Sequence, residues 1–209
     1  TVIRGLGEIH LKAKLEKIAA QYKLEVTTRP SRIPYRETIT APAEGVHRHK
    51  KQSGGAGQFG EVHLRVEPMG RGEGFEFVDA VKGGVIPGVF MAAVEKGVRQ
   101  GLEGGVVAGY QVDDLKVTVF DGKTHAVDGK EVAFVTAGRK AVIEAVRAAR
   151  PIVLEPIVSV EIIVPEPSIG DLTGDLSSRR GHITGTDGRG HGMAAIAGEV
   201  PLAELSDYQ

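Results

Sequence analysis

The pattern of apolar and polar residues divides the chain into three stretches. The first, residues 1 to about 32, predicts one amphipathic helix between two short strands. Apolar residues three or four positions apart line one face of this helix: Leu11, Leu15, Ile18 and Tyr22. The second strand begins at Leu24 and stops at Pro30. One helix and two short strands bury too little surface to fold well alone, so we expect half of a domain.

The middle stretch, residues 33 to about 153, predicts a sheet with helices on one face. Alternation with a period of two indicates strands around residues 35–49, 59–67, 74–81 and 110–120. Two helices, at about 87–102 and 130–149, each carry an apolar stripe, and the first opens on Pro87, which suits a first helical turn. Strands outnumber amphipathic helices, so a sheet covered on one side is the simplest architecture.

The last stretch, residues 154–209, predicts strand, helix, strand, strand. Its helix starts after Ser168, a suitable N-cap, and ends at Gly181. The two strands that follow are expected to turn at Asp187-Gly188, a strong hairpin signal. This order is most of a ferredoxin-like fold, whose second helix would start near Leu202. The whole chain is therefore expected to be α+β.

Composition and charge fit a soluble globular protein of one or two domains, with 41% hydrophobic and 25% charged residues. The net charge of −1 means that any nucleic-acid contact must come from a local patch. The absence of cysteine excludes disulfides and thiolate chemistry and agrees with a reducing cytoplasm. No apolar stretch approaches the ~20 residues that span a bilayer, so we expect no membrane partner. The chain opens on Thr1 without a signal-like segment, and we expect it to be a piece of a longer protein.

A glycine run at residues 54–60, Gly-Gly-Ala-Gly-Gln-Phe-Gly, matches GxGxxG, and Val62 extends the match to the loop of protein kinases. A dinucleotide fingerprint must open a helix, whereas residues 61–68 alternate as a strand does. We therefore interpret the run as the flexible tip of a strand-loop-strand element. Glycines allow positive φ and let another backbone come close.

Five basic or titratable residues, His47 to Lys51, precede this run with three fixed positive charges and two imidazoles. That combination suits a phosphate backbone, although the loop could also bind a mononucleotide or merely turn a corner. A kinase would need a downstream lysine on a strand, an aspartate base and a metal-binding aspartate with their own motifs, and the sequence has none of these. His47 and His49 share one side of a strand without a third ligand, so we predict no metal.

A second loop is expected near His125. Gly122-Lys123-Thr124 resembles the end of a P-loop, but Val117 stands where that motif needs its earlier glycine. Asp121-Gly122 instead predicts a turn, which places His125 in or beyond a loop. Should this loop lie beside the glycine tip, His125 would join the basic run.

Further charged residues have simpler explanations. Arg179 and Arg180 close the last helix, where cations favour the negative end of the dipole. Arg189, with Gly190 and His191, forms a second cationic tip that permits RNA contact. Asp113 and Asp114 adjoin each other on an expected strand and should point to opposite faces, so they are not a catalytic dyad.

Several stretches, in order along nearly the whole chain, resemble the translation elongation factor G family. They are GLGEIHL at 5–11, YRETI at 35–39, QSGGAGQFG at 52–60, GFEFVD at 74–79, GGVIP at 83–87, LEP at 154–156, GDLSSRRG at 174–181 and VPLAE at 200–204. The resemblance implies three parts: residues 1–32 end the third domain, 33–153 form the fourth and 154–209 form an incomplete fifth. The implied folds are a ferredoxin-like half domain, a ribosomal-protein-S5-domain-2-like α/β sandwich and a ferredoxin-like domain.

In this family the fourth domain is an arm whose tip enters the decoding site of the small ribosomal subunit and promotes movement of tRNA and mRNA. The resemblance implies tip contacts from Arg48, Lys50, Lys51, Gln52, Gly54, Gly55, Ala56, Gly57, Gln58 and His125. It implies looser contacts in the fifth domain from Arg179, Arg180 and Arg189. We expect a non-catalytic, cytoplasmic, monomeric piece that binds ribosomal RNA and the mRNA-tRNA complex, with GTP and Mg²⁺ bound by a domain outside this chain.

The sequence departs from the family pattern at Ala56, at Gly129-Lys130 and at Arg139-Lys140. These departures indicate a divergent paralogue, so a ribosome-recycling or ribosome-protection factor stays open as an alternative, as does a regulatory paralogue that occupies ribosomes without moving anything. The alternative of another class is a nucleotide-dependent small-molecule kinase that uses the 54–60 loop.

Overall fold

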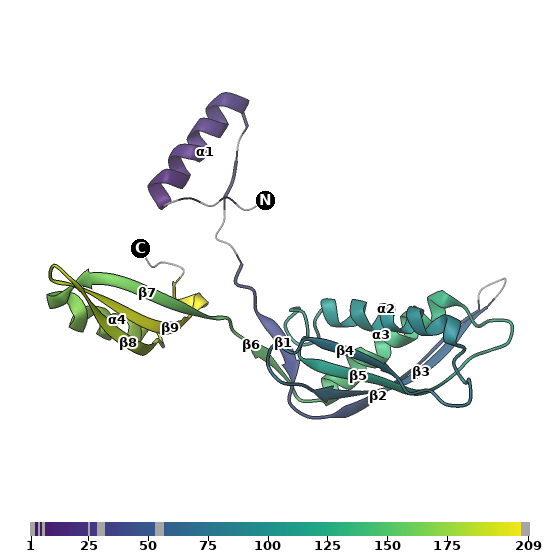
Figure 1. Cartoon of the computed structure of the whole chain (residues 1–209). Coiled ribbons are helices and arrows are strands. Elements are labelled where there is room, and N and C mark those ends of the chain that lie inside the picture. Colours follow the sequence, from purple (N-terminus) through teal and green to yellow (C-terminus); the bar gives the residue numbers. More distant parts are fainter. Residues whose placement is uncertain are drawn as a thin grey trace. The chain divides into compact units, whose positions relative to one another are not determined.

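The computed structural model describes residues 3, 5, 7–24, 26–28, 32–52 and 57–205. The chain divides into two compact units, one formed by Tyr35–Leu154 and the other by Thr1–Pro34 with Glu155–Gln209. The described residues mix helices with three separate sheets (Figure 1). The expected α+β class is therefore confirmed.

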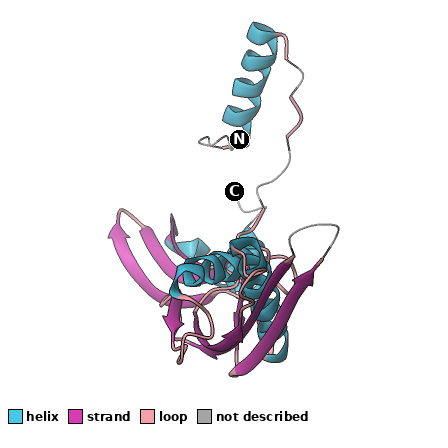
Figure 2. Ribbon diagram, turned by 90° about the vertical axis from the view of Figure 1, so that its right-hand side faces the viewer, coloured by secondary structure: helices cyan, strands magenta, loops and turns pink. Residues whose placement is uncertain are grey.

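The unit Tyr35–Leu154 is built on a four-stranded sheet with two helices on one face. The sheet has the order β2-β3-β5-β4, with β2 Ala43–Lys51, β3 Gln58–Pro68, β5 Leu115–Lys123 and β4 Phe75–Asp79. Neighbouring strands are antiparallel except for β4 and β5, which are parallel. The helices α2 (Met91–Glu103) and α3 (Glu131–Ala148) lie against the same face of the sheet (Figures 1 and 2).

The core of this unit follows the periodicity of the sequence. Val62, Leu64 and Val66 alternate along β3 and are fully buried, as is Phe134 on α3. Phe90, in the short 3-10 turn η1 (Gly88–Phe90) before α2, stacks on Phe134 with ring centroids 4.8 Å apart. Both expected helices are confirmed, because their apolar stripes are the faces that the sheet buries.

Two strand predictions need correction. The strand expected at 35–49 is divided into β1 (Arg36–Ile39) and β2, and β1 pairs with β6 (Pro151–Leu154) in a sheet of its own. Pro42 lies between them and has no amide hydrogen with which to continue a ladder. The strand expected from residue 110 starts only at Leu115, because Asp114 adopts a φ of 58°, in the left-handed region.

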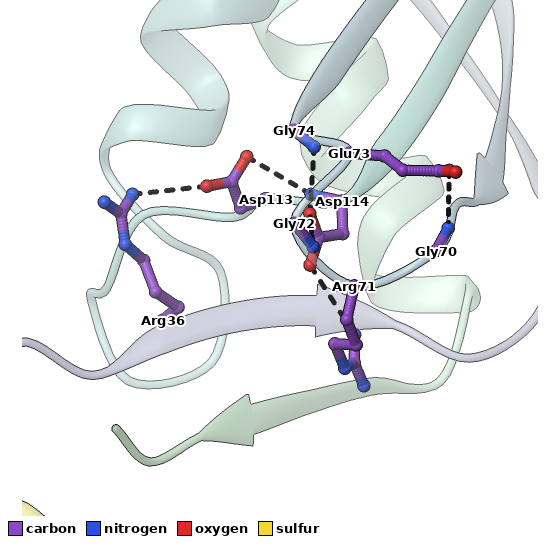
Figure 3. A network of polar contacts seen from close by, with 8 residues as sticks. All are labelled: Arg36, Gly70, Arg71, Gly72, Glu73, Gly74, Asp113 and Asp114. Carbon is purple, nitrogen blue, oxygen red and sulfur yellow. Dashed lines mark hydrogen bonds and ion pairs between the residues drawn. The ribbon is translucent and has the colours of Figure 1, made fainter. Parts of the chain in front are cut away.

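Asp113 and Asp114 consequently do not lie on a strand, contrary to the prediction. The Asp114 Oδ1 atom accepts hydrogen bonds from the amides of Gly72 and Gly74 at 3.0 and 2.9 Å (Figure 3). Asp113 lies 3.5 Å from the guanidinium of Arg36. The two carboxylates therefore hold different segments, the β3–β4 loop and β1.

The residues Glu155–Gln209 contain strand, helix, strand and strand in the expected order. They are β7 Ile157–Pro165, α4 Ile169–Ser178, β8 His182–Gly190 and β9 Met193–Pro201, in the sheet order β7-β9-β8. The short 3-10 segments η2 (Glu166–Ser168) and η3 (Leu202–Leu205) stand before α4 and after β9. Ser168 occupies the N-cap of α4, but its side chain makes no capping hydrogen bond.

The hairpin between β8 and β9 turns later than expected. Asp187 and Gly188 pair with Ala195 and Ala194 inside the ladder. The two connecting residues are His191 and Gly192, with φ of 52° and 71°. Two-residue hairpin turns of this kind require positive φ at both positions. The sequence offers glycines at several nearby positions, and the register against β9 decides which of them turns.

The first stretch contains α1 (Glu8–Tyr22), none of whose residues is buried. The strands expected on either side are wrong for the described residues, which form no strand there. A strand is defined by hydrogen bonds to a neighbour, and no described segment pairs with these residues. Tyr22, placed on the expected apolar face, is 62% exposed.

Candidate nucleic-acid interface

The basic run lies at the end of β2, directly opposite the start of β3. Lys51 pairs with Gln58 and Lys50 with Phe59, so the two strands end side by side. Gln52 follows β2 and Gly57 precedes β3, while the predicted contacts Gly54, Gly55 and Ala56 lie outside the described residues. The strand predicted after the glycine run is confirmed. The run therefore does not open a helix, as a dinucleotide fingerprint would require.

The second candidate loop covers residues 124–130, between β5 and α3. The turn expected at Asp121-Gly122 is wrong, because Gly122 stays in the strand and pairs with Val62. A Cβ on Gly122 would lie 2.4 Å from the Glu61 carbonyl oxygen and 2.5 Å from Ile86, so close packing explains this glycine. His125 lies in the loop, as expected, and its side chain is 55% exposed.

This loop lies against the start of β3. The Phe59 amide donates a 2.7 Å hydrogen bond to the Asp128 carbonyl, and Phe59 forms a parallel bridge with Gly129. The rings of Phe59 and His125 have centroids 6.2 Å apart. A Cβ on Gly57 would lie 2.7 Å from the carboxylate carbon of Asp128, so a larger residue at position 57 would have to displace that carboxylate. Because Phe59 also pairs with Lys50, the structure brings the His125 loop to the same end of the sheet as the basic run.

The cations of the basic run differ in how far they are neutralised. Lys50 and Lys51 are exposed, and neither makes a side-chain hydrogen bond or ion pair with another described residue. Arg48 instead pairs with Glu61, which is almost buried and also lies 2.9 Å from Nε2 of His63. The hydrogen bond from Arg48, with that from His63, lowers the pKa of Glu61 despite its burial. The free positive charge of the run is therefore concentrated on the two lysines.

The two histidines of the run have separate partners. His47 Nδ1 lies 3.2 Å from a carboxylate oxygen of Glu144 on α3, and His49 Nε2 lies 3.1 Å from Oε1 of Gln58. Within the described part of the chain, no three histidine or acidic side chains are grouped so that they could hold a metal ion. Both imidazoles thus anchor β2 to its neighbours.

The three arginines of the last stretch are each paired with carboxylates. Arg180 at the end of α4 bridges Glu155 and Glu204, at 2.8 and 2.9 Å, and these hydrogen bonds raise its pKa. Arg179 pairs with Asp175 and donates a 2.7 Å hydrogen bond to the Glu204 carbonyl. Arg189 pairs with Glu161. These contacts explain the arginines structurally, and their role as contacts to another molecule stays a prediction.

Sequence reasoning did not single out Asp128 or Glu61, which organise the two parts of this end of the sheet. In the sequence, Asp128 is only the last residue of the run Thr-His-Ala-Val-Asp at 124–128, and Glu61 is only one polar residue of an alternating strand. Both depend on contacts between segments far apart in the sequence, so no local signal marks them.

Comparison with known proteins identifies the family. Residues 31–150 match the family model described as elongation factor G, domain IV, and residues 152–209 match that of the elongation factor G C-terminus. The chain belongs to the elongation factor G family. It is 46% identical over 208 residues to an elongation factor G-like protein of Thermotoga maritima, a match that covers 100% of this chain and 30% of that relative.

A solved structure from Thermus thermophilus has the same fold, with a TM-score of 0.87 and 39% identity. The match covers 98% of this chain and 30% of that one. The chain thus spans about a third of the length of both proteins. The two loops described above belong to the elongation factor G domain IV, and Arg179, Arg180 and Arg189 to its C-terminal domain. No helix in the described part is long and apolar enough to cross a membrane.

Proposed function

We propose that this chain is the ribosome-binding arm of an elongation factor G-like translational GTPase. Its domain IV enters the decoding site of the small subunit and promotes movement of tRNA and mRNA. One observation carries this proposal: Lys50 and Lys51 lie at the same end of the sheet as the His125 loop. The hydrogen bond from the Phe59 amide to the Asp128 carbonyl fixes that loop against β3. A domain outside this chain binds GTP and Mg²⁺.

The electrostatics of this end support an RNA partner. The chain as a whole has a net charge of −1, so long-range attraction to RNA is weak. Two lysines without carboxylate partners in the described part nevertheless give one end a local positive potential. Arg48 contributes less, because Glu61 neutralises it. Phosphate contact by lysine releases counterions and makes binding dependent on salt.

Replacing Lys50 and Lys51 together by alanine is expected to weaken binding to small ribosomal subunits and to flatten its dependence on salt. Loss of two phosphate contacts should reduce the slope of log K against log salt by about 1.4, at about 0.7 per contact with single-stranded nucleic acid. Binding of the fluorescently labelled chain, titrated at several salt concentrations, measures this slope. The matched control is Lys96→Ala with Lys140→Ala, which removes the same charge from exposed positions on α2 and α3. If the Lys50→Ala, Lys51→Ala variant had the same slope of log K against log salt as the parent, this would count against phosphate contact by these lysines.

Replacing His125 by alanine in the full-length protein is expected to slow translocation about tenfold while GTP hydrolysis stays intact, since one tip hydrogen bond is lost. The physical reason is that His125 lies at the tip, whereas hydrolysis belongs to a different domain. Rapid-mixing assays of tRNA movement and phosphate release measure the two steps separately. Equal translocation rates for the variant and the parent would reject this role.

The two alternative roles within the family, recycling and protection, would use the same arm. The departures at Gly129-Lys130 and Arg139-Lys140 are compatible with either. Complementation by the full-length protein of a strain that lacks its main translocase separates a translocase from a recycling, protection or regulatory paralogue, because only a translocase restores growth. The kinase alternative has no support from the family matches, which assign the glycine run to domain IV.

A further inference from the structure

The imidazole of His125 closes its own loop. Its Nδ1 atom accepts hydrogen bonds from the backbone amides of Val127 and Asp128, at 3.3 and 3.2 Å. The carbonyl of the same residue accepts a 2.8 Å hydrogen bond from Gly129. The side chain therefore acts as asparagine or aspartate does in a turn, where a side-chain acceptor caps the amides two and three residues ahead.

A ring nitrogen that accepts a hydrogen bond carries no proton, so a neutral ring in this position bears its proton on Nε2. We propose that the loop fixes His125 as the Nε2–H tautomer, and that the tip thereby presents a neutral hydrogen-bond donor to an acceptor atom of RNA. The part of this proposal that concerns RNA rests on the proposed function. The tautomer itself rests only on the loop.

One neighbouring group favours a different state. A carboxylate oxygen of Asp128 lies 3.6 Å from Nδ1, where it would attract a proton on that nitrogen and make the ring a cation. Against it stand two amide donors, which would lose their acceptor if Nδ1 were protonated. The backbone of Asp128 is fixed by the hydrogen bond from the Phe59 amide to its carbonyl, and its carboxylate lies beside Gly57. Two backbone amides thus favour an unprotonated Nδ1, and one carboxylate favours a protonated Nδ1. We expect the two amides to prevail, because both donate hydrogen bonds to that atom.

The two states would recognise RNA differently. A neutral Nε2–H donor suits a ribose hydroxyl oxygen, a phosphate oxygen or a ring nitrogen of a base, and it releases no counterion. A cation would seek phosphate and add to the salt dependence of binding. The side chain of His125 is 55% exposed and the loop occupies its Nδ1 side, so we expect RNA to approach the ring from the Nε2 side.

Nitrogen NMR of the imidazole rings in the 209-residue chain tests the tautomer without any ribosome. At a pH of about 8, where ordinary imidazole rings are neutral, the His125 signals should show a protonated Nε2 and a bare Nδ1. His125→Ala assigns the signals. A protonated Nδ1, alone or together with a protonated Nε2, would overturn the proposal.

Two variants divide the functions of the ring. His125→Asn places an acceptor where Nδ1 stands and keeps the loop closed, but it offers no donor at the Nε2 position. His125→Gln reaches that position with an amide donor and leaves the two loop amides uncapped. We expect the asparagine variant to bind small subunits carrying mRNA and tRNA about tenfold more weakly than the parent, with an unchanged salt slope, and the glutamine variant to lose about threefold or less.

The Phe59 amide resonance reports whether the loop still rests on β3 in each variant. Binding by the asparagine variant that equals or exceeds binding by the parent would overturn the donor role. A salt slope lower than that of the parent by about 0.7 would overturn it too, because such a drop indicates that a cation has been lost. Failure of the parent chain to bind would overturn the proposed function instead, and the NMR result would still decide the tautomer.

Discussion

Replacing Glu37 by glutamine is expected to lower the free energy of unfolding of the Tyr35–Leu154 unit by about 4 kcal/mol, from two buried donors left unsatisfied at about 1–3 kcal/mol each. Glu37 is fully buried on β1, and its carboxylate accepts four backbone hydrogen bonds from the loop after α2. The donors are Val106 and Val107 on one oxygen, at 2.7 and 2.9 Å, and Ala108 and Tyr110 on the other, at 2.7 and 3.1 Å. A glutamine has the same shape but turns an amide group toward two of them.

Urea unfolding followed by far-ultraviolet circular dichroism measures this loss, and amide hydrogen exchange at Val106 and Ala108 locates it. The control is Glu73→Gln, because Glu73 accepts only one backbone hydrogen bond among the described residues, from Gly70, on an exposed loop. We expect the control to change stability by less than about 1 kcal/mol. A Glu37 variant as stable as the control would show that the loop does not depend on the carboxylate.

The same carboxylate predicts a dependence of stability on pH. Burial alone would raise the pKa of Glu37, but the hydrogen bonds from Val106, Ala108, Val107 and Tyr110 together lower it from the ordinary value of 4.5. A lowered folded-state pKa means that the contribution is complete above the ordinary value of 4.5 and is lost as the pH falls through the folded-state value. The glutamine variant should therefore lose less stability than the parent as the pH falls below 4.5.

Replacing Gly97 by alanine is expected to destabilise the same unit by about 3 kcal/mol, the upper part of the usual range for overpacking a core. Gly97 is buried on α2 where α2 crosses α3. A Cβ there would lie 2.1 Å from the carbonyl oxygen of Val135 and 3.0 Å from the amide nitrogen of Arg139. Both are backbone atoms of α3, so the helices must separate to make room.

The matched control is Gly104→Ala at the C-cap of the same helix. Its φ is −76°, and a Cβ there would meet its nearest atom at 3.8 Å. Alanine at this position is expected to change stability by less than about 1 kcal/mol. Denaturant midpoints of the two variants give the comparison directly. Similar midpoints would mean that α2 and α3 can shift apart at little cost.

The sequence by itself determined the elements whose signal is local. The apolar stripes of α2 and α3 and the alternation along β3 recur with the period of the structure that they form, so these elements are found where expected. The order strand, helix, strand, strand in the last stretch was predictable for the same reason. The family resemblance also follows from the sequence alone, since its motifs run in order along the chain.

Only the tertiary structure decided how distant segments meet. Three sets of contacts link segments that are separated in the sequence. They are the pairing of Phe59 with Asp128 and Gly129, the ion pair of Arg48 with Glu61, and the four amides around Glu37. The β8–β9 turn falls at His191-Gly192 because the ladder with β9 continues past Asp187-Gly188. Local periodicity fixes which face of an element is apolar, but the contacts that build the tip depend on the packing of the whole unit.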